Sequence, residues 1–325
     1  MRMNRPIQAL GITLIALACA GFECSPAFPQ DAQVAFDRAL QAFRAGDNQK
    51  AAAILEENLK AHPDHAPSHE LIGLAFSALG RSNEALQHLR EALKLWPDQA
   101  VYWTNLSIFY LRESRRAEAE EALHQSLEVE PTPPAFRLLG LIRLDQHSDE
   151  KAVQLFSKAL DLADDDVESW YYLGLAQQAL AHSGEALRSY QEALKRAPGD
   201  FHTQVQMGTL LLTLGQRQDA LVHLRAAREI RPQSPQVYRL LSEAYLGAGN
   251  LNQAFESGNH AVELTPGDRQ AHYQLGLVLA RMGHNEEAAK EFAISEGLPK
   301  KPEMTPLERW RELHSEGLRN NGSKP

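Results

Sequence analysis

The feature that most constrains the fold of this chain is a repeat of 34 residues that runs through most of its length. Small residues recur at one phase of the repeat and alanines recur twelve residues later, both in steps of 34 residues with one step of 33. The small residues are Ala39, Gly73, Ser107, Gly140, Gly174, Gly208, Ser242 and Gly276. The alanines are Ala51, Ala85, Ala119, Ala152, Ala186, Ala220, Ala254 and Ala288. Two series locked in phase over this distance define a repeat array.

Each repeat predicts two helices joined by a turn. Ala85, Leu89, Ala92 and Leu93 share one face of a helix, as a packed second helix requires. A glycine that can end the first helix stands at Gly46, Gly80, Gly215, Gly249 and Gly283. A proline that cannot continue the second helix stands at Pro63, Pro97, Pro131, Pro198, Pro232 and Pro266. The chain is therefore predicted to be all-α.

This pattern resembles the tetratricopeptide repeat (TPR), whose signature is W-x2-L-G-x2-Y…A-x3-F…P. The fifth repeat carries the signature as Trp170, Leu173, Gly174, Ala186, Tyr190 and Pro198. The resemblance implies a right-handed superhelical solenoid of about eight helix-turn-helix units. We expect these units at residues 32–65, 66–99, 100–132, 133–166, 167–200, 201–234, 235–268 and 269–302. Asp164 replaces the stop proline of the fourth unit.

The two ends of the chain lie outside the array. Arg2 and Arg5 precede an apolar run that closes on small residues, so we expect residues 1–20 to be a secretory signal peptide and 21–31 a linker. A lipidated Cys19 and an uncleaved membrane anchor are the alternatives. At the other end, residues 303–325 hold the sequence Thr305-Pro306-Leu307-Glu308, which predicts a capping box and a helix that caps the array, followed by a tail.

Charge and cysteine content exclude several classes of protein. The 325-residue chain has a net charge of −9, which becomes −11 when Arg2 and Arg5 are removed. A broad basic surface for nucleic acid is therefore not expected. The two cysteines, Cys19 and Cys24, rule out a disulfide framework and a cysteine-rich zinc site.

The resemblance also implies where a partner binds. In the family, side chains at unit positions 2, 5, 9, 12 and 13 of each first helix line a concave groove. Carried onto this sequence, the candidate peptide-binding residues are Phe36, Phe43, Ile108, Arg112, Arg137, Tyr171, Val205, Arg239, Tyr273 and Arg281. Such a lining suits a peptide with hydrophobic side chains and carboxylates. The alternative for the apolar members is packing between adjacent first helices.

Catalytic and metal-binding patterns are nearly absent. No H-E-x-x-H, G-x-S-x-G or P-loop pattern occurs, and the 23 residues after the array are too few for a catalytic domain. The single weak metal candidate is the cluster of His62, His65 and His69. We therefore expect no cofactor and no enzymatic activity.

The function expected from these observations is that of an exported, periplasmic or secreted protein-interaction scaffold or assembly factor. Its partners would be proteins or peptides held in the concave groove, with no nucleic acid. Contact with a membrane would come only through an N-terminal lipid or uncleaved anchor. The first alternative is a lipid-anchored envelope assembly factor for outer-membrane or pilus machinery. A metal-dependent enzyme built on His62, His65 and His69 is the distant alternative.

Overall fold

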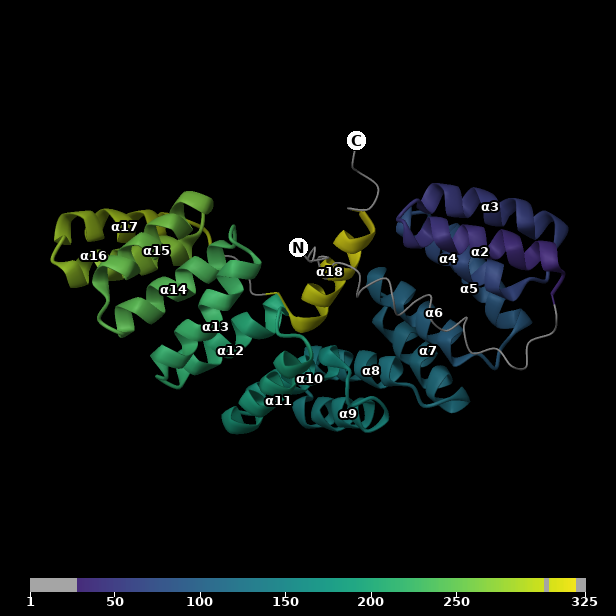
Figure 1. The fold of residues 1–325 in the computed structure, drawn as a ribbon, viewed down its shortest axis with the longest axis horizontal. Helices are drawn as coiled ribbons and strands as arrows, with labels where there is room; N and C mark the ends of the chain where they lie inside the picture. The colour runs from purple at the N-terminus through teal and green to yellow at the C-terminus, as the bar shows by residue number, and fades with distance from the viewer. Residues whose placement is uncertain (1–27, 301–303, 320–325) are drawn as a thin grey trace, which may run out of the picture. The chain divides into compact units, whose positions relative to one another are not determined.

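Pairs of antiparallel helices, one pair to each repeat, make up the array (Figure 1). The computed structural model describes residues 28–300 and 304–319, and no strand occurs in these ranges. The first helices are α2 (Gln30–Arg44), α4 (Ala66–Ala78), α6 (Ala100–Arg112), α8 (Pro133–Asp145), α10 (Val167–Ala179), α12 (Phe201–Thr213), α14 (Pro235–Gly247) and α16 (Arg269–Met282). The second helices are α3 (Asn48–Ala61), α5 (Ser82–Leu95), α7 (Arg116–Val129), α9 (Asp149–Leu162), α11 (Ser183–Arg196), α13 (Arg217–Ile230), α15 (Leu251–Leu264) and α17 (Asn285–Gly297). One further helix, α18 (Pro306–Arg319), follows.

The array divides into two compact units. The first contains the described residues up to 162 together with 304–319, and the second contains 163–300. Each unit is an all-α helical-repeat solenoid, because the two helices of a repeat pack on each other and the next repeat packs on them. The predicted signal peptide lies outside the described residues. None of the helices described is both long enough and apolar enough to cross a membrane.

The small residue of each first helix lets the two helices of a repeat approach closely. A Cβ built on Gly174 would lie 2.5 Å from Cε1 of Tyr190, and one on Gly140 would lie 2.7 Å from Cε1 of Phe156. Tyr190 and Phe156 have no solvent exposure. These two repeats therefore pair a missing side chain on one helix with a large buried ring on the other, and in the repeats of Gly73 and Gly208 a leucine takes the place of the ring.

The turn between the helices of a repeat always contains one residue in the left-handed region. Five of these residues are glycines, with φ between 74° and 87°. In the other three repeats the same place is taken by Ser114 (φ 61°), His147 (φ 54°) and Ala181 (φ 61°). The phase of the repeat imposes this conformation even where the residue has a Cβ, which costs about 1–2 kcal/mol.

A second recurring contact holds the turn between repeats. In five of the repeats, the fourth residue of the repeat donates a side-chain N–H to the backbone carbonyl six residues earlier. The donors and acceptors are His69 Nε2 and Pro63 (2.9 Å), Trp103 Nε1 and Pro97 (2.8 Å), Trp170 Nε1 and Asp164 (2.8 Å), Gln204 Nε2 and Pro198 (3.0 Å), and His272 Nε2 and Pro266 (2.9 Å). Since only a carbonyl is required, Asp164 replaces proline without loss of this bond.

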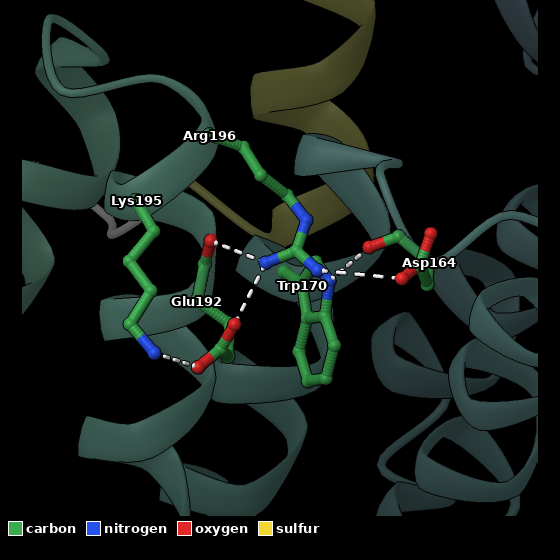
Figure 2. Close-up of polar contacts among 5 residues, drawn as sticks. All are labelled: Asp164, Trp170, Glu192, Lys195 and Arg196. Carbon is green, nitrogen blue, oxygen red and sulfur yellow. Dashed lines mark hydrogen bonds and ion pairs between the residues drawn. The ribbon is translucent and has the colours of Figure 1, made fainter.

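Further contacts surround the turn at Asp164 (Figure 2). The guanidinium of Arg196 lies 5.4 Å from the centroid of the Trp170 ring, and its Nη2 is 3.8 Å from Oδ2 of Asp164. Arg196 Nη1 also donates to the carbonyl and to Oε2 of Glu192, at 3.0 and 2.8 Å, while Lys195 pairs with the other carboxylate oxygen of Glu192. These side chains are partly exposed, so the ion pairs position the turn more than they stabilise it.

The helix after the last repeat forms where the capping box predicts it. Thr305 N donates to Glu308 Oε2 at 2.8 Å, and Glu308 N donates to Thr305 Oγ1 at 3.2 Å. We expected this helix to pack on the end of the array, at α17. Instead its packing partners are α4, α6 and α8 of the first unit. Helix α17 keeps Glu286, Glu287 and Lys290 exposed, and Ile294 on the same helix is 44 % exposed as well.

Candidate functional site

The second unit carries an open pocket on its first helices. Its volume is about 540 Å³. First helices α12, α14 and α16 supply nearly all of its wall, and α12 packs against α14 and α14 against α16. The lining residues are Leu212, Arg217, Arg239, Glu243, Leu246, Gly247, Gln270, Tyr273, Gln274 and Leu277. The pocket lies at the groove positions that the repeat predicts.

Tyr273 and Arg239 give this pocket its chemical character. The Tyr273 side chain is 53 % exposed, an unusual state for a large aromatic residue, and its ring centroid lies 5.7 Å from that of Phe292. Arg239 is half-buried and faces the same pocket as the exposed carboxylate of Glu243. Leucines from each of the three helices add apolar surface to the wall, and Gln270 and Gln274 add polar groups. The pocket can therefore take an apolar side chain and pair a neighbouring carboxylate with arginine.

Arg217 is a pocket residue that the repeat positions did not predict. It lies at the start of α13, a second helix, whereas the family's groove positions all lie on first helices. Its side chain passes over Gly247, where a Cβ would collide with Nε and Cδ of the arginine. The one signal of this in the sequence is Gly247 itself, because a glycine at a groove position leaves room for a side chain from another helix.

The other candidate groove residues of the second unit do not line this pocket. Tyr171 is 8 % exposed and its ring packs beside those of Tyr172 and Tyr190, at 5.1 and 6.3 Å between centroids. Val205 is 4 % exposed. Both pack in the interior, as the alternative interpretation of the apolar positions describes. Arg281 is exposed on α16, outside the pocket wall.

In the first unit the candidate residues are mostly covered. Phe36 and Phe43 are 2 % and 3 % exposed, and the Phe36 ring lies 5.9 Å from that of His65. Ile108 and Arg112 are half-buried on α6, where Arg112 Nη1 donates to Ser77 Oγ at 3.0 Å. Arg137 on α8 is only 5 % exposed. The structure thus brings Arg239 and Tyr273 together in one open pocket but buries their counterparts in the first unit.

The candidate metal histidines point to different partners. His62 Nε2 contacts Asp31 Oδ2 at 3.1 Å, and His65 Nδ1 contacts Ser68 Oγ at 2.8 Å. His69 contacts the Pro63 carbonyl and, through Nδ1, Nδ1 of His88 at 2.9 Å. Within the described residues, no group of three histidine, cysteine or acidic side chains could hold a metal ion.

The histidines instead support the ends of helices. His65 is the N-cap of α4 and accepts a hydrogen bond from the Ser68 amide at 3.2 Å. Burial lowers the pKa of His65 to about 4, and burial with the neighbouring His69 lowers the pKa of His88 to about 4. Neutral histidines can serve as buried hydrogen-bonding groups, which is the role of His65 and His88.

A second pocket, of about 440 Å³, lies in the first unit between α5, α6 and α7. Its wall includes Arg90, Trp103, Tyr110 and Glu118, and Arg90 Nη2 donates to the Tyr110 hydroxyl at 3.1 Å. Second helices supply most of its lining, so it is separate from the groove positions. None of the candidate residues predicted from the sequence lines it.

Stacked pairs of antiparallel helices define a helical-repeat protein. Models of the tetratricopeptide repeat match residues 36–100 and 106–167, and further models of the same repeat match 183–244 and 211–256. The chain belongs to the tetratricopeptide-repeat family. Proteins of this family are in general protein-interaction scaffolds.

Several curated proteins share part of this array. Superkiller protein 3 of Schizosaccharomyces pombe is 28 % identical over 187 residues, which is 53 % of this chain and 13 % of that protein. BBSome complex member BBS4 of Bos taurus is 23 % identical over 190 residues, which is 58 % of this chain and 36 % of that protein. The chain therefore spans an eighth to about a third of the length of these relatives.

Solved structures share the helical-repeat fold. The structure of pilF from Pseudomonas aeruginosa is 18 % identical and matches with a TM-score of 0.58, covering 63 % of this chain and 94 % of that one. MamA from Desulfovibrio magneticus RS-1, residues 41 to the end, is 27 % identical with a TM-score of 0.49, covering 51 % of this chain and 94 % of that one. The match to pilF shows the fold, which agrees with the array described above.

Proposed function

We propose that this protein is an interaction scaffold or assembly factor that binds peptide segments of other proteins in the pocket on α12, α14 and α16. The observation that carries the proposal is the exposed Tyr273 ring in an open pocket with Arg239. A large exposed aromatic beside an arginine is the composition of a protein-binding hot spot. No group of residues in this pocket has the arrangement of a nucleophile and its base, so we assign it binding and no catalysis.

The expected ligand follows from the wall of the pocket. Leu212, Leu246 and Leu277 can contact an apolar side chain, and Arg217 with Arg239 can receive a carboxylate. Charge-assisted hydrogen bonds to arginine contribute about 1.5–3 kcal/mol each. We therefore expect a peptide in which an aliphatic or aromatic residue lies next to an aspartate, a glutamate or a free C-terminus.

A displayed peptide library selected on the full chain tests the proposal. Enriched peptides should combine apolar and acidic residues, and calorimetry with a synthetic copy should give a binding constant that Arg239→Glu weakens by tenfold or more, since about 1.4 kcal/mol corresponds to tenfold. Tyr273→Ala should weaken it similarly. The matched control is Arg281→Glu, which makes the same change of charge on an exposed arginine outside the pocket. Equal affinity for Arg239→Glu and the wild type would place binding elsewhere.

We propose further that the protein acts outside the cytoplasm, on the strength of the signal-like pattern in residues 1–20. Mass spectrometry of the protein from its host distinguishes the three N-termini. A chain that begins at Gly21 supports cleavage and release into the periplasm or medium. A diacylated Cys19 supports the lipid-anchored alternative, and an intact Met1 supports an uncleaved anchor or no export.

A further inference from the structure

Helix α18 contains within itself the hydrogen bonds that define its start. Its capping box satisfies two backbone amides at its own N-terminus, and Pro306 occupies the first turn, where no amide is needed. His314 Nδ1 approaches the Trp310 carbonyl at 2.8 Å and the two rings stack, with centroids 4.4 Å apart. The helix therefore needs no hydrogen bond from the repeats in order to form.

The buried face of α18 is narrow and strongly apolar. Leu307 has no exposure and Trp310 is 2 % exposed, whereas Glu308 and Glu312 are exposed on the opposite side. Leu307 and Trp310 are one helical turn apart, so they form a pair of anchors on one face. The helix packs on α4, α6 and α8, which are successive first helices of the first unit. These are the helices whose positions form the groove in this family.

Burial in the first unit agrees with an occupied groove. Arg137 of α8 and Arg239 of α14 hold the same repeat position, in the matching sequences Arg-Leu-Leu-Gly and Arg-Leu-Leu-Ser. Arg239 lines an open pocket, whereas Arg137 is 5 % exposed on a helix that packs against α18. Glu70, at the same repeat position of α4, is 4 % exposed. Arg137 and Glu70 are thus charged-type residues buried at groove positions of two helices that α18 packs against, and Glu70 also accepts a hydrogen bond from Asn105 of α6.

We propose that the concave face of α4, α6 and α8 is a binding site for an amphipathic helix, and that the chain's own α18 fills this site until a partner helix displaces it. The partner would present an aliphatic residue and an aromatic residue one turn apart, as Leu307 and Trp310 are presented, on a helix with charged residues opposite. Aromatic and aliphatic anchors of this kind dominate binding of a helix in a groove. The proposal rests on the proposed function in that both use the groove positions, but it concerns the first unit alone.

Removing the anchors while keeping the helix tests this proposal in the full chain. The variant Leu307→Ala/Trp310→Ala weakens the internal helix, and a fluorescein-labelled synthetic peptide of residues 304–319 serves as the probe. In the wild type, only the fraction of molecules whose site is open can bind the peptide, so the apparent affinity is reduced to that fraction of its intrinsic value. Fluorescence anisotropy should therefore show that the variant binds the peptide about tenfold or more tightly than the wild type. The matched control, Glu312→Ala on the exposed face of α18, should behave as the wild type does.

Hydrogen exchange locates the peptide and separates this proposal from the previous one. The peptide should protect amides of α4, α6 and α8 in the variant and leave α12, α14 and α16 unchanged, and Arg239→Glu should not alter its affinity. In the wild type, an excess of isotope-labelled peptide should speed exchange in the chain's own α18, a readout that requires no variant. If Arg239→Glu did not weaken the binding of library peptides, the proposed function would be refuted. The results for the peptide of residues 304–319 would still stand.

Three results would overturn the proposal. One is equal affinity of the peptide for the wild type and the double variant. Another is the absence of binding to a double variant whose circular dichroism shows the full helix content, together with unchanged exchange in wild-type α18. The third is a wild-type mass by light scattering that is twice that of the double variant, which would mean that α18 binds a second copy.

Discussion

Arg137 and Arg239 hold one position in two copies of the same repeat, yet their surroundings differ. Both repeats begin their first helix with proline and continue through Arg-Leu-Leu and a small residue. Arg239 faces a pocket of about 540 Å³, and Arg137 is buried on a helix that α18 packs against. The same residue at the same repeat position is thus open in one unit and covered in the other. One difference between the two units is that α18 packs on the first unit alone.

Reversing the charge of the two arginines should have unequal effects on stability. Arg137→Glu places a carboxylate in a buried position and should lower the free energy of unfolding by about 3 kcal/mol or more. Arg239→Glu changes a half-buried residue at the rim of a pocket and should stay within about 0.5 kcal/mol. Urea denaturation followed by circular dichroism measures both. Equal costs would mean that the two positions are buried alike.

A glycine at the helix crossing tests whether the two units are stabilised separately. Gly174→Leu, in the second unit, must displace the buried Tyr190 ring and should cost about 3 kcal/mol by overpacking. Hydrogen exchange should show the loss in the second unit only, and Gly140→Leu should show it in the first. Gly184→Leu is the control, since a Cβ there meets no atom within 4 Å. Destabilisation of both units by Gly174→Leu would show that they unfold together.

The free energy of unfolding of the first unit should depend on pH through the buried Glu70. In the last repeat of the second unit, the same repeat position is held by the exposed Tyr273. Burial raises the pKa of Glu70 from 4.5 to about 8, although the hydrogen bond from Asn105 Nδ2 opposes the shift. The folded state then holds a proton that the unfolded state releases. The contribution of Glu70 to the free energy of unfolding is fully present below pH 4.5. It falls by about 1.4 kcal/mol per pH unit as the pH rises to about 8.

Glu70→Gln should remove that dependence, because the amide oxygen still accepts from Asn105 and carries no charge. Urea midpoints of the variant and the wild type should agree near pH 4.5 and diverge toward pH 8, with the variant more stable. Parallel curves at all pH values would mean that Glu70 ionises as freely in the folded chain as in the unfolded one.

The smallest expected effect concerns the left-handed turn residues. Ala181→Gly in the second unit and Ser114→Gly in the first should each raise stability by about 0.5 kcal/mol, since relief of the strained φ exceeds the added entropy of the unfolded chain. Gly215→Ala makes the opposite change and should lower stability by about 1 kcal/mol. Thermal unfolding measures all three, and a loss of stability in Ala181→Gly would contradict the argument.

The repeat period predicted the array because its constraints are local. Gly174 and Tyr190 lie sixteen residues apart on two joined helices, so their contact follows from the repeat alone. The same period gives the phase of the turn residue, although only the structure shows that Ser114, His147 and Ala181 adopt positive φ. Within the pocket, Arg239 and Tyr273 follow from the groove positions.

The docking of α18 did not follow from the sequence, because it depends on distance in space. Leu307, Trp310 and Leu313 predict a helix with one apolar face, but several faces of the array could cover it. The last repeat is nearest along the chain, yet the helix packs on repeats more than 150 residues earlier along the chain. Arg217 was missed for a related reason, since it enters the groove from a neighbouring second helix.

The hydrogen bond from the fourth residue of a repeat to a preceding carbonyl affects how well such repeats can be recognised from their sequence. Tryptophan, histidine and glutamine all make this bond at 2.8–3.0 Å, with proline or aspartate supplying the carbonyl. What these five repeats share at this place is a hydrogen-bond donor at a fixed distance from the carbonyl, supplied by three unlike amino acids. A sequence signature that specifies a single amino acid at this position therefore misses repeats that keep the same contact. The helix pair α16–α17, whose donor is His272, lies beyond residue 256, the last that the repeat models match.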